Sequence, residues 1–305
     1  MDLRFLHVSD LHFGRHSVPE QVEGVRRLIA EERLDAIIIS GDLSQRTRTR
    51  EFEQASAFIK LAEARAPVLV VPGNHDTAWW TAPLGMGSLH AMHARYRKHV
   101  REELEPVLHI PGATIVGLNS AHGIRAFTLT KRLRDLSVVG ALREEQWAKA
   151  RHEFAAAPAG DAKVLVFHHN LLLGDLSHRW GLSNRAGGIR SALGSGVDLV
   201  LCGHDHQAKV DAVNPVGAND QRIVVACAST LTTRVRGGGP GSINAIEVDD
   251  KTIQVNVLQW SREAKEFTRV LWARYTRWGG ADEPADLGVR GGAGGGHDGG
   301  RFGST

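Results

Sequence analysis

Seven side chains of the kinds that bind transition metals lie in five short motifs of this chain. The motifs are Asp10-Leu11-His12, Gly41-Asp42, Gly73-Asn74-His75-Asp76, His168-His169-Asn170 and Gly203-His204-Asp205-His206. Carboxylate and amide oxygens together with imidazole nitrogens suit Mn, Fe, Zn or Co. The candidate metal ligands are therefore Asp10, His12, Asp42, Asn74, His168, His204 and His206.

The spacing of the motifs predicts how these side chains share ions. In an extended segment, residues two apart point the same way, so Asp10 and His12 can bind one ion. Adjacent residues diverge, so we expect His168 to be a ligand and His169 to lie behind it. Seven donors are enough for two ions that share a bridging carboxylate, for which Asp42 has two oxygens.

The third motif also contains a candidate proton donor. His75 is a titratable group that follows Asn74, and we expect the carboxylate of Asp76 to fix its tautomer. The catalytic residues that we predict are therefore His75 and Asp76.

Each motif alone has an ordinary alternative, such as an aspartate in a turn or a packed histidine. Chance clusters of histidine are expected, because the chain contains 16 histidines. The position that the five motifs share nevertheless favours a metal site. Each follows the C-terminal end of an apolar run, the edge at which ligands gather in open α/β sheets. The apolar runs with the pattern of strands are 5–8, 36–39, 68–71, 114–118, 164–167 and 197–201.

These runs predict an α/β fold. They are continuously hydrophobic, which indicates strands covered on both faces, and amphipathic helices are expected near 19–33, 49–65, 88–104, 142–156 and 186–194. After residue 206, strand patterns at 208–213, 222–226, 242–248 and 252–258 predict a second, more antiparallel sheet. The segment 263–278 has the pattern of a final helix or strand. We predict one domain over 1–278 and a glycine-rich disordered tail over 279–305.

Composition restricts the class of protein further. The formal charge is +3 and the sequence pI is about 9.0, which suits an anionic substrate without indicating nucleic-acid binding. Cys202 and Cys227 lie in apolar runs and do not indicate a disulfide framework. The first residues show no signal-peptide pattern, and no apolar run reaches the length of a membrane span. We expect a cytoplasmic protein without a membrane partner.

The ordered set of motifs resembles the calcineurin-like metallophosphoesterase superfamily, over about the first 210 residues. Val8-Ser9-Asp10-Leu11-His12 and Gly41-Asp42-Leu43 are similar to its bacterial cyclic-nucleotide and glycerophosphodiester phosphodiesterase branch. The resemblance implies a four-layer αββα sandwich of two mixed sheets flanked by helices. It implies that Asp10, His12 and His206 hold one ion, that Asn74, His168 and His204 hold the other, and that Asp42 bridges them.

The resemblance also implies an activity. We expect a metal-dependent phosphodiesterase that hydrolyses small phosphodiesters, with 3′,5′-cyclic AMP as the leading substrate, through a dinuclear metal centre and a bridging hydroxide. In this pattern His75 is not a ligand and donates a proton to the leaving oxygen. The paired histidines of this branch are often followed by prolines, whereas here Asn170-Leu171-Leu172-Leu173 follows. The resemblance therefore does not specify the shape of the substrate rim near Asn170.

Two alternatives remain at this stage: a DNA exonuclease of the repair type on the same fold, and a binding scaffold without metal. A small phosphodiester is the expected partner; a nucleic acid is not required, and a homo-oligomer is left open. Candidates for the substrate rim are His122 and the basic residues Arg46, Arg125, Lys131, Arg132, Arg179 and Arg185.

Overall fold

The computed structural model contains two six-stranded mixed sheets, and it describes residues 2–78, 89–122, 139–177, 181–213 and 222–277. The first sheet has the strand order β12-β11-β10-β1-β2-β3 and the second β4-β5-β6-β7-β9-β8. The strands of the first sheet are β1 (Leu3–Val8), β2 (Ala36–Ile39), β3 (Val68–Val70), β10 (Ser242–Val248), β11 (Thr252–Ser261) and β12 (Glu266–Thr276). Those of the second are β4 (Val107–Ile110), β5 (Ala113–Gly117), β6 (Ala162–Val166), β7 (Leu199–Cys202), β8 (Lys209–Val213) and β9 (Ile223–Cys227).

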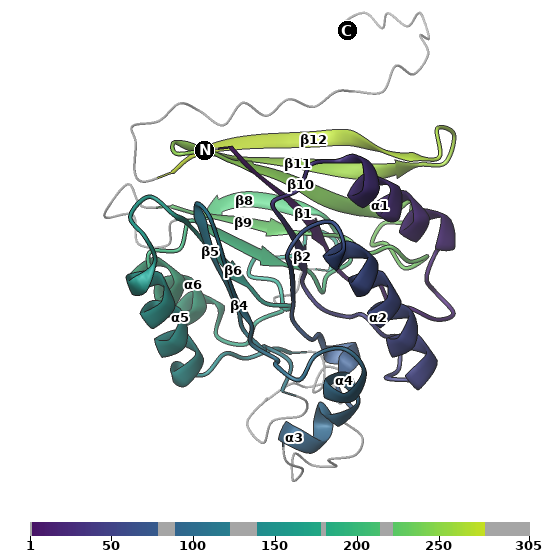
Figure 1. Cartoon of the computed structure of the whole chain (residues 1–305), viewed down its shortest axis with the longest axis horizontal. Coiled ribbons are helices and arrows are strands. Elements are labelled where there is room, and N and C mark those ends of the chain that lie inside the picture. The colour runs from purple at the N-terminus through teal and green to yellow at the C-terminus, as the bar shows by residue number, and fades with distance from the viewer. Residues whose placement is uncertain (1, 79–88, 123–138, 178–180, 214–221, 278–305) are drawn as a thin grey trace, which may run out of the picture.

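Helices cover the outer face of each sheet (Figure 1). The described helices are α1 (Pro19–Glu31), α2 (Thr49–Glu63), α3 (Leu89–Met92), α4 (Ala94–His99), α5 (Glu144–Ala156) and α6 (Arg185–Gly194). Helices α1 and α2 lie on the first sheet, and α5 and α6 lie on the second. The layers therefore run helix, sheet, sheet, helix, and the predicted four-layer sandwich is confirmed.

Strand β2 shows why the central strands are hydrophobic without interruption. Ile37 and Ile39 pack under α1 and α2, whereas Ile38 between them packs into the core that joins the two sheets. In β6, Val164 faces that inter-sheet core and Leu165 faces α5 and α6. Successive side chains of a strand point to opposite faces, so a strand with a core on each side needs apolar residues at every position.

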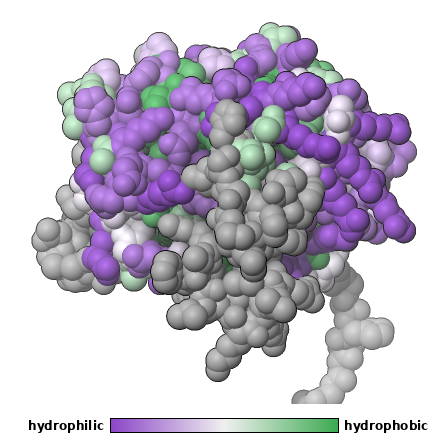
Figure 2. Space-filling view, turned by 90° about the horizontal axis from the view of Figure 1, so that it is seen from below, coloured by the Kyte–Doolittle hydropathy of each residue, from purple (hydrophilic) through white to green (hydrophobic). Residues whose placement is uncertain are grey.

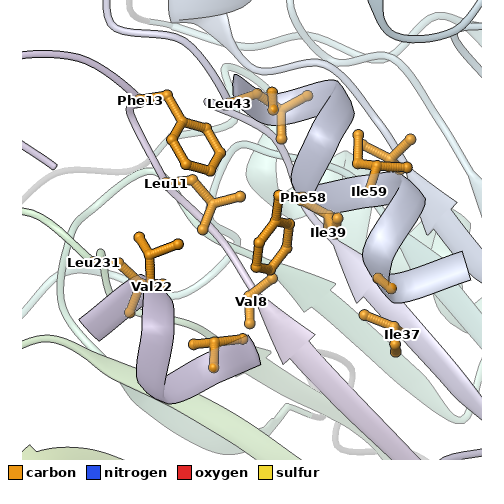
Figure 3. Packing of buried hydrophobic residues seen from close by; sticks show 14 of the residues in the cluster. Val8, Leu11, Phe13, Val22, Ile37, Ile39, Leu43, Phe58, Ile59 and Leu231 are labelled. Atoms are coloured by element: carbon orange, nitrogen blue, oxygen red, sulfur yellow. The ribbon is translucent and has the colours of Figure 1, made fainter. Parts of the chain in front are cut away.

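The same alternation positions the motifs. Leu11, Phe13 and Leu43, which are neighbours of the candidate metal ligands, point into the core beneath α1 and α2 and lie near Phe58 (Figure 3). Each apolar neighbour anchors its segment, so the polar residues beside it are held at a fixed place at the sheet edge.

The predicted partition of strands between the sheets is wrong. The strands after residue 206 do not form a sheet of their own: β9 pairs parallel with β7 and carries β8 at the edge, while β10 pairs antiparallel with β1 and carries β11 and β12. An apolar pattern identifies a strand but not its neighbour, and the open edges of β1 and β7 accept these later strands.

Of the remaining predictions about helices, strands and cysteines, some are confirmed and others are wrong. The helix predicted over 88–104 is two short helices, α3 and α4, and the strand β4 was not predicted. Within the segment 263–278, residues Glu266–Thr276 form the strand β12, in a hairpin with β11. Cys202 and Cys227 are both free thiols. The tail 279–305 lies outside the described residues, as do Arg125, Lys131, Arg132 and Arg179.

The described part of one face of the molecule is mostly polar. Figure 2 views the molecule from below Figure 1, and the described residues on that face are mostly hydrophilic, with hydrophobic ones scattered among them. Among the helices within the described ranges, none is long and apolar enough to cross a membrane.

Arg277 joins the two sheets at their far end. It follows β12 of the first sheet, and its guanidinium donates to the Asp249 carbonyl at 2.6 Å, to the Asp161 carbonyl at 3.1 Å and to Asp198 Oδ2 at 3.3 Å. Asp161 directly precedes β6 and Asp198 directly precedes β7 of the second sheet. The side chains of Arg277 and Asp198 are both buried. Burial raises the pKa of Asp198, against hydrogen bonds from the Lys163 amide and Arg277, so the arginine keeps a desolvated carboxylate in place.

Substitution of Arg277 is therefore expected to destabilise the fold. Arg277→Ala should lower the free energy of unfolding by about 3–5 kcal/mol, because it leaves a buried carboxylate without its cation. Urea unfolding followed by circular dichroism measures the change. Arg274→Ala is the control, since Arg274 is an exposed residue of the same strand that bonds only at the surface to Gln254. Equal losses in the two variants would contradict the inter-sheet role.

Candidate metal centre

The five motifs meet between the two sheets. The Asp10, Asp42 and Asn74 motifs follow β1, β2 and β3 of the first sheet, while the motifs of His168 and His204 follow β6 and β7 of the second. Both sets lie at the carboxyl ends of parallel strands. The predicted convergence at strand ends is present, and it depends on the packing of one sheet on the other.

One group of donor atoms contains Asp10, His12, Asp42 and His206. One atom of each lies within 4.8 Å of all the others. Nε2 of His206 is 3.2 Å from Asp10 Oδ1 and 3.0 Å from Nε2 of His12. Nε2 of His12 is 3.5 Å from Asp10 Oδ1 and 3.5 Å from Asp42 Oδ2. These four side chains face a common point.

A second group contains Asn74, His168 and His204, and it shares Asp42 with the first. Asn74 Oδ1 is 3.1 Å from His168 Nε2 and 3.0 Å from His204 Nδ1, and the two imidazole nitrogens are 3.3 Å apart. His168 Nε2 is also 3.3 Å from Asp42 Oδ2. The same oxygen of Asp42 therefore faces both groups.

Backbone carbonyls fix the orientation of two histidines. His206 Nδ1 lies 3.0 Å from the Arg234 carbonyl and His168 Nδ1 lies 2.8 Å from the Ser40 carbonyl. A carbonyl only accepts, so both rings carry a proton on Nδ1 and direct Nε2 at carboxylate oxygens. That contact is favourable when a second proton on Nε2 or a metal cation lies between the two atoms. The donor set therefore fits cations.

The carboxylates are held by their other oxygens. Asp10 Oδ2 accepts from Ser9 Oγ at 2.6 Å and from the His204 amide at 2.9 Å, and Asp42 Oδ1 accepts from the His75 amide at 2.8 Å. Asp10 Oδ1 is buried and accepts no hydrogen bond from the described residues. One oxygen of each carboxylate is thus fixed and the other is left for a ligand, as in the outer shell of metal sites.

The electrostatics indicate the same demand for positive charge. Burial opposes a charge on His168, yet the Asp42 carboxylate outweighs it and raises the pKa of His168 to about 10. The pKa of Asp42 is lowered, against its burial, mainly by His168 and His75. Burial and then the charge of His168 lower the pKa of His204 to about 3. The two carboxylates stabilise a cation in their midst.

The backbone of the site is unusual. Asp10, His12, Asp42, His204 and His206 all have positive φ values, between 41° and 74°. The prediction that Asp10 and His12 share a side because their segment is extended is therefore correct in outcome and wrong in cause. Left-handed residues on either side of Leu11 turn both polar side chains into the site. Such backbone strain is typical of functional sites.

Two glycines make room for the carboxylates. A Cβ on Gly73 would lie 2.1 Å from Asp42 Oδ1, and one on Gly203 would lie 2.4 Å from Asp10 Oδ2 and 1.8 Å from Ser9 Oγ. Any side chain at either position would displace the carboxylate beside it.

The predicted partnership of His75 and Asp76 is wrong. Asp76 accepts four hydrogen bonds at 2.8–3.0 Å, from the amides of Leu43, Ser44 and Gly73 and from the Ser44 hydroxyl. It therefore fixes the turn that carries the third motif. The His75 ring instead places Nδ1 2.9 Å from the Gln45 carbonyl, which fixes its tautomer. A backbone carbonyl gives no signal in the sequence, so Gln45 could not be identified there.

The two remaining candidates lie behind the ligands. His169 is buried, its Nδ1 is 2.8 Å from Ser120 Oγ, and its ring centre is 4.5 Å from that of His204. Burial, followed by the charge of His204, lowers the pKa of His169 well below its ordinary value, so it is neutral. His122 is buried as well, with Nε2 3.4 Å from Gln146 Oε1 of α5, so it is not an exposed rim residue.

Comparison with known proteins identifies the class. The family model of the calcineurin-like phosphoesterases matches residues 3–208, and the chain belongs to this family. A segment of 85 residues is 34% identical to the glycerophosphodiester phosphodiesterase GpdQ of Enterobacter lignolyticus (strain SCF1). That match covers 23% of this chain and 28% of the relative.

Solved structures with the same fold include a purple acid phosphatase. The structure of PhoD superposes with a TM-score of 0.68 and 11% identity, over 95% of this chain and 73% of that one. Purple acid phosphatase PPD1 from yellow lupin (Lupinus luteus) gives 0.64 and 10%, over 90% and 53%. Identities this low establish the fold alone. The family match and the cluster of Asp and His side chains together identify the chain as a hydrolase of the phosphoesterase superfamily. Its site has the residue types that bind metal ions.

Gly73→Ala tests the clearance beside Asp42. The added methyl group should displace the Asp42 carboxylate and weaken Mn(II) binding at least about tenfold, the effect typical of changes just outside the ligands. Isothermal titration calorimetry with Mn(II) measures the affinity. Gly194→Ala is the control, because a Cβ there meets nothing within 4 Å. Unchanged Mn(II) affinity in Gly73→Ala would contradict the assignment of Asp42.

Proposed function

We propose that this protein is a phosphodiesterase that hydrolyses small phosphodiesters at a centre of two transition-metal ions. The observation that carries the proposal is the shared oxygen of Asp42. Asp42 Oδ2 lies 3.5 Å from Nε2 of His12 in one group of ligand atoms and 3.3 Å from Nε2 of His168 in the other. Two sets of donors joined through one carboxylate are the arrangement that two-metal phosphoesterases need.

The two groups of side chains correspond to two ions. The first ion would be held by Asp10, His12 and His206. The second would be held by Asn74, His168 and His204, and Asp42 would bind both ions. Mixed nitrogen and oxygen donors suit Mn, Fe, Zn or Co. Two such cations would neutralise the charge of a phosphodiester and lower the pKa of a water molecule toward neutrality.

His75 is the residue that we assign to proton transfer. It is only half-buried, whereas the proposed ligands Asp10, His12 and His168 are fully buried, so it can reach a substrate. Its Nδ1 proton is held by the Gln45 carbonyl, which leaves Nε2 as the nitrogen that exchanges a proton with the leaving oxygen. Asp76 acts only by holding the turn in place.

One comparison supports a diester substrate: the relative from Enterobacter lignolyticus is a glycerophosphodiester phosphodiesterase. The net charge of +3 favours an anionic ligand of either ester type. We take 3′,5′-cyclic AMP as the representative substrate.

The first test compares wild type with Asp42→Ala. In the presence of Mn(II), wild type should hydrolyse bis(p-nitrophenyl) phosphate and cyclic AMP, and Asp42→Ala should lose this activity because both groups of donors lose a ligand. Linear single-stranded DNA is assayed in parallel. Hydrolysis of DNA alone would favour an exonuclease, and metal binding without any hydrolysis would overturn the proposal.

His75→Asn tests proton transfer separately from metal binding. Loss of a general acid should lower kcat for cyclic AMP by roughly 10²–10⁴, because its alkoxide must be protonated as it leaves. Bis(p-nitrophenyl) phosphate releases a stabilised phenolate and should be affected far less. Mn(II) affinity should persist, since His75 is not a ligand. His109→Asn, at a mostly exposed position on β4, is the control. An equal loss on both substrates would argue against the assignment.

A further inference from the structure

Two surface segments are joined beside the centre. The Thr233 amide donates to the His16 carbonyl at 3.0 Å, the Val18 amide donates to the Leu231 carbonyl at 3.0 Å, and Ser17 forms an isolated β-bridge with Thr232. Segments 15–18 and 231–234 therefore hold each other at a fixed separation.

The joined segments carry a basic cluster, Arg15, His16 and Arg234, with Arg46 nearby. Arg234 Nη2 donates to His16 Nε2 at 2.8 Å, so this imidazole nitrogen accepts. Glu51 links Arg46 to the cluster: its Oε2 accepts from the Arg46 amide at 2.8 Å, and its Oε1 is 2.9 Å from the position of a Cβ on Gly14, the neighbour of Arg15. Slight burial and then the charges of Arg234, Arg15 and Arg46 lower the pKa of His16. All three arginines are exposed.

Among the described residues, no carboxylate forms an ion pair with the guanidinium groups of Arg15, Arg46 or Arg234. Glu51 is close, and its Oε2 accepts from the backbone amides of Arg46 and Arg48 at 2.8 and 3.2 Å. One carboxylate does not balance three positive charges, and a bound anion would relieve the repulsion that remains.

Backbone groups connect the cluster to the proposed centre. The Arg234 carbonyl accepts the His206 Nδ1 proton at 3.0 Å, and the His206 side chain is 16% exposed. Arg46 follows Gln45, whose carbonyl lies 2.9 Å from Nδ1 of His75. The backbone of the cluster is therefore tied to a partly exposed ligand and, through Gln45, to the proposed proton donor.

We propose that Arg15, His16, Arg46 and Arg234 bind a second phosphate group of the substrate, separate from the scissile diester. This inference rests on the proposed function and narrows it to phosphodiesters in which one arm carries a further phosphate. Guanidinium groups bind phosphate oxygens through paired, charge-assisted hydrogen bonds, which suits them to this role. Cyclic AMP has no such group, so it reports on the metal centre alone.

A pair of matched substrates tests the cluster. Thymidine 5′-(p-nitrophenyl phosphate) has a free 3′-hydroxyl, and the same compound with a 3′-phosphate adds only the second anion. Wild type should prefer the phosphorylated compound in kcat/KM. Each of Arg15→Gln, Arg46→Gln and Arg234→Gln should lower that preference roughly tenfold, the loss of one charge-assisted hydrogen bond. Arg234→Gln keeps the backbone carbonyl that holds His206.

The control is Arg33→Gln, which removes the same charge at a site that is 82% exposed and outside the cluster, and it should leave the preference unchanged. No preference in wild type, or an equal effect of the variants on both compounds, would overturn the inference. Calorimetry tests the cluster independently of the proposed function, by comparing the affinities for thymidine 3′,5′-bisphosphate and thymidine 5′-monophosphate. If binding of the bisphosphate is preferred and depends on the arginines while no diester is hydrolysed, the proposed function is wrong and the phosphate site stands.

Discussion

Two buried carboxylates that face imidazole nitrogens are the constraint around which this molecule is built. Asp10 and Asp42 are almost fully removed from water, and each has one oxygen fixed by hydrogen bonds and one directed at imidazole nitrogens. An isolated ionised carboxylate would be very unfavourable there, so the environment must supply positive charge. The carbonyls of Ser40 and Arg234 fix the two histidine rings that meet this requirement, because they bind Nδ1 and so direct Nε2 of His168 and His206 at the carboxylates.

Meeting that constraint requires both sheets. Asp10, Asp42 and Asn74 come from the first sheet, and the histidines 168, 204 and 206 come from the second. Their distances of about 3 Å are therefore set by the apolar core between the sheets, to which Phe5 and Ile38 contribute from one side and Val164 and Leu201 from the other. A close-packed core transmits small displacements, so packing far from the centre also determines its geometry.

The sequence was sufficient for the features that follow from local pattern. Polar motifs after apolar runs identified the strand ends and the layered α/β class, and they contain the side chains that the structure brings together between the sheets. Three features lay beyond it. Sheet membership of β8 to β12 depends on which strand edges are open; the partner of His75 is a backbone carbonyl; and the positive φ of Asp10 and His12 depends on the turns into which they are folded. Asp76 was misassigned because adjacency in sequence was taken for contact, whereas its carboxylate is used entirely by backbone amides and the Ser44 hydroxyl.

The division between centre and periphery explains why the fold alone does not specify a substrate. Proteins of very different sequence share this sandwich. In this chain the constraint on the centre concerns only a few donors and the glycines beside them. Residues of the outer segments, such as Arg15 and Arg234, are free of that constraint: the hydrogen bonds that join 15–18 to 231–234 are made by backbone groups, and so is the one that holds His206. Side chains there can change without disturbing the ligands. Selectivity for the rest of the substrate can therefore vary on a centre that stays fixed.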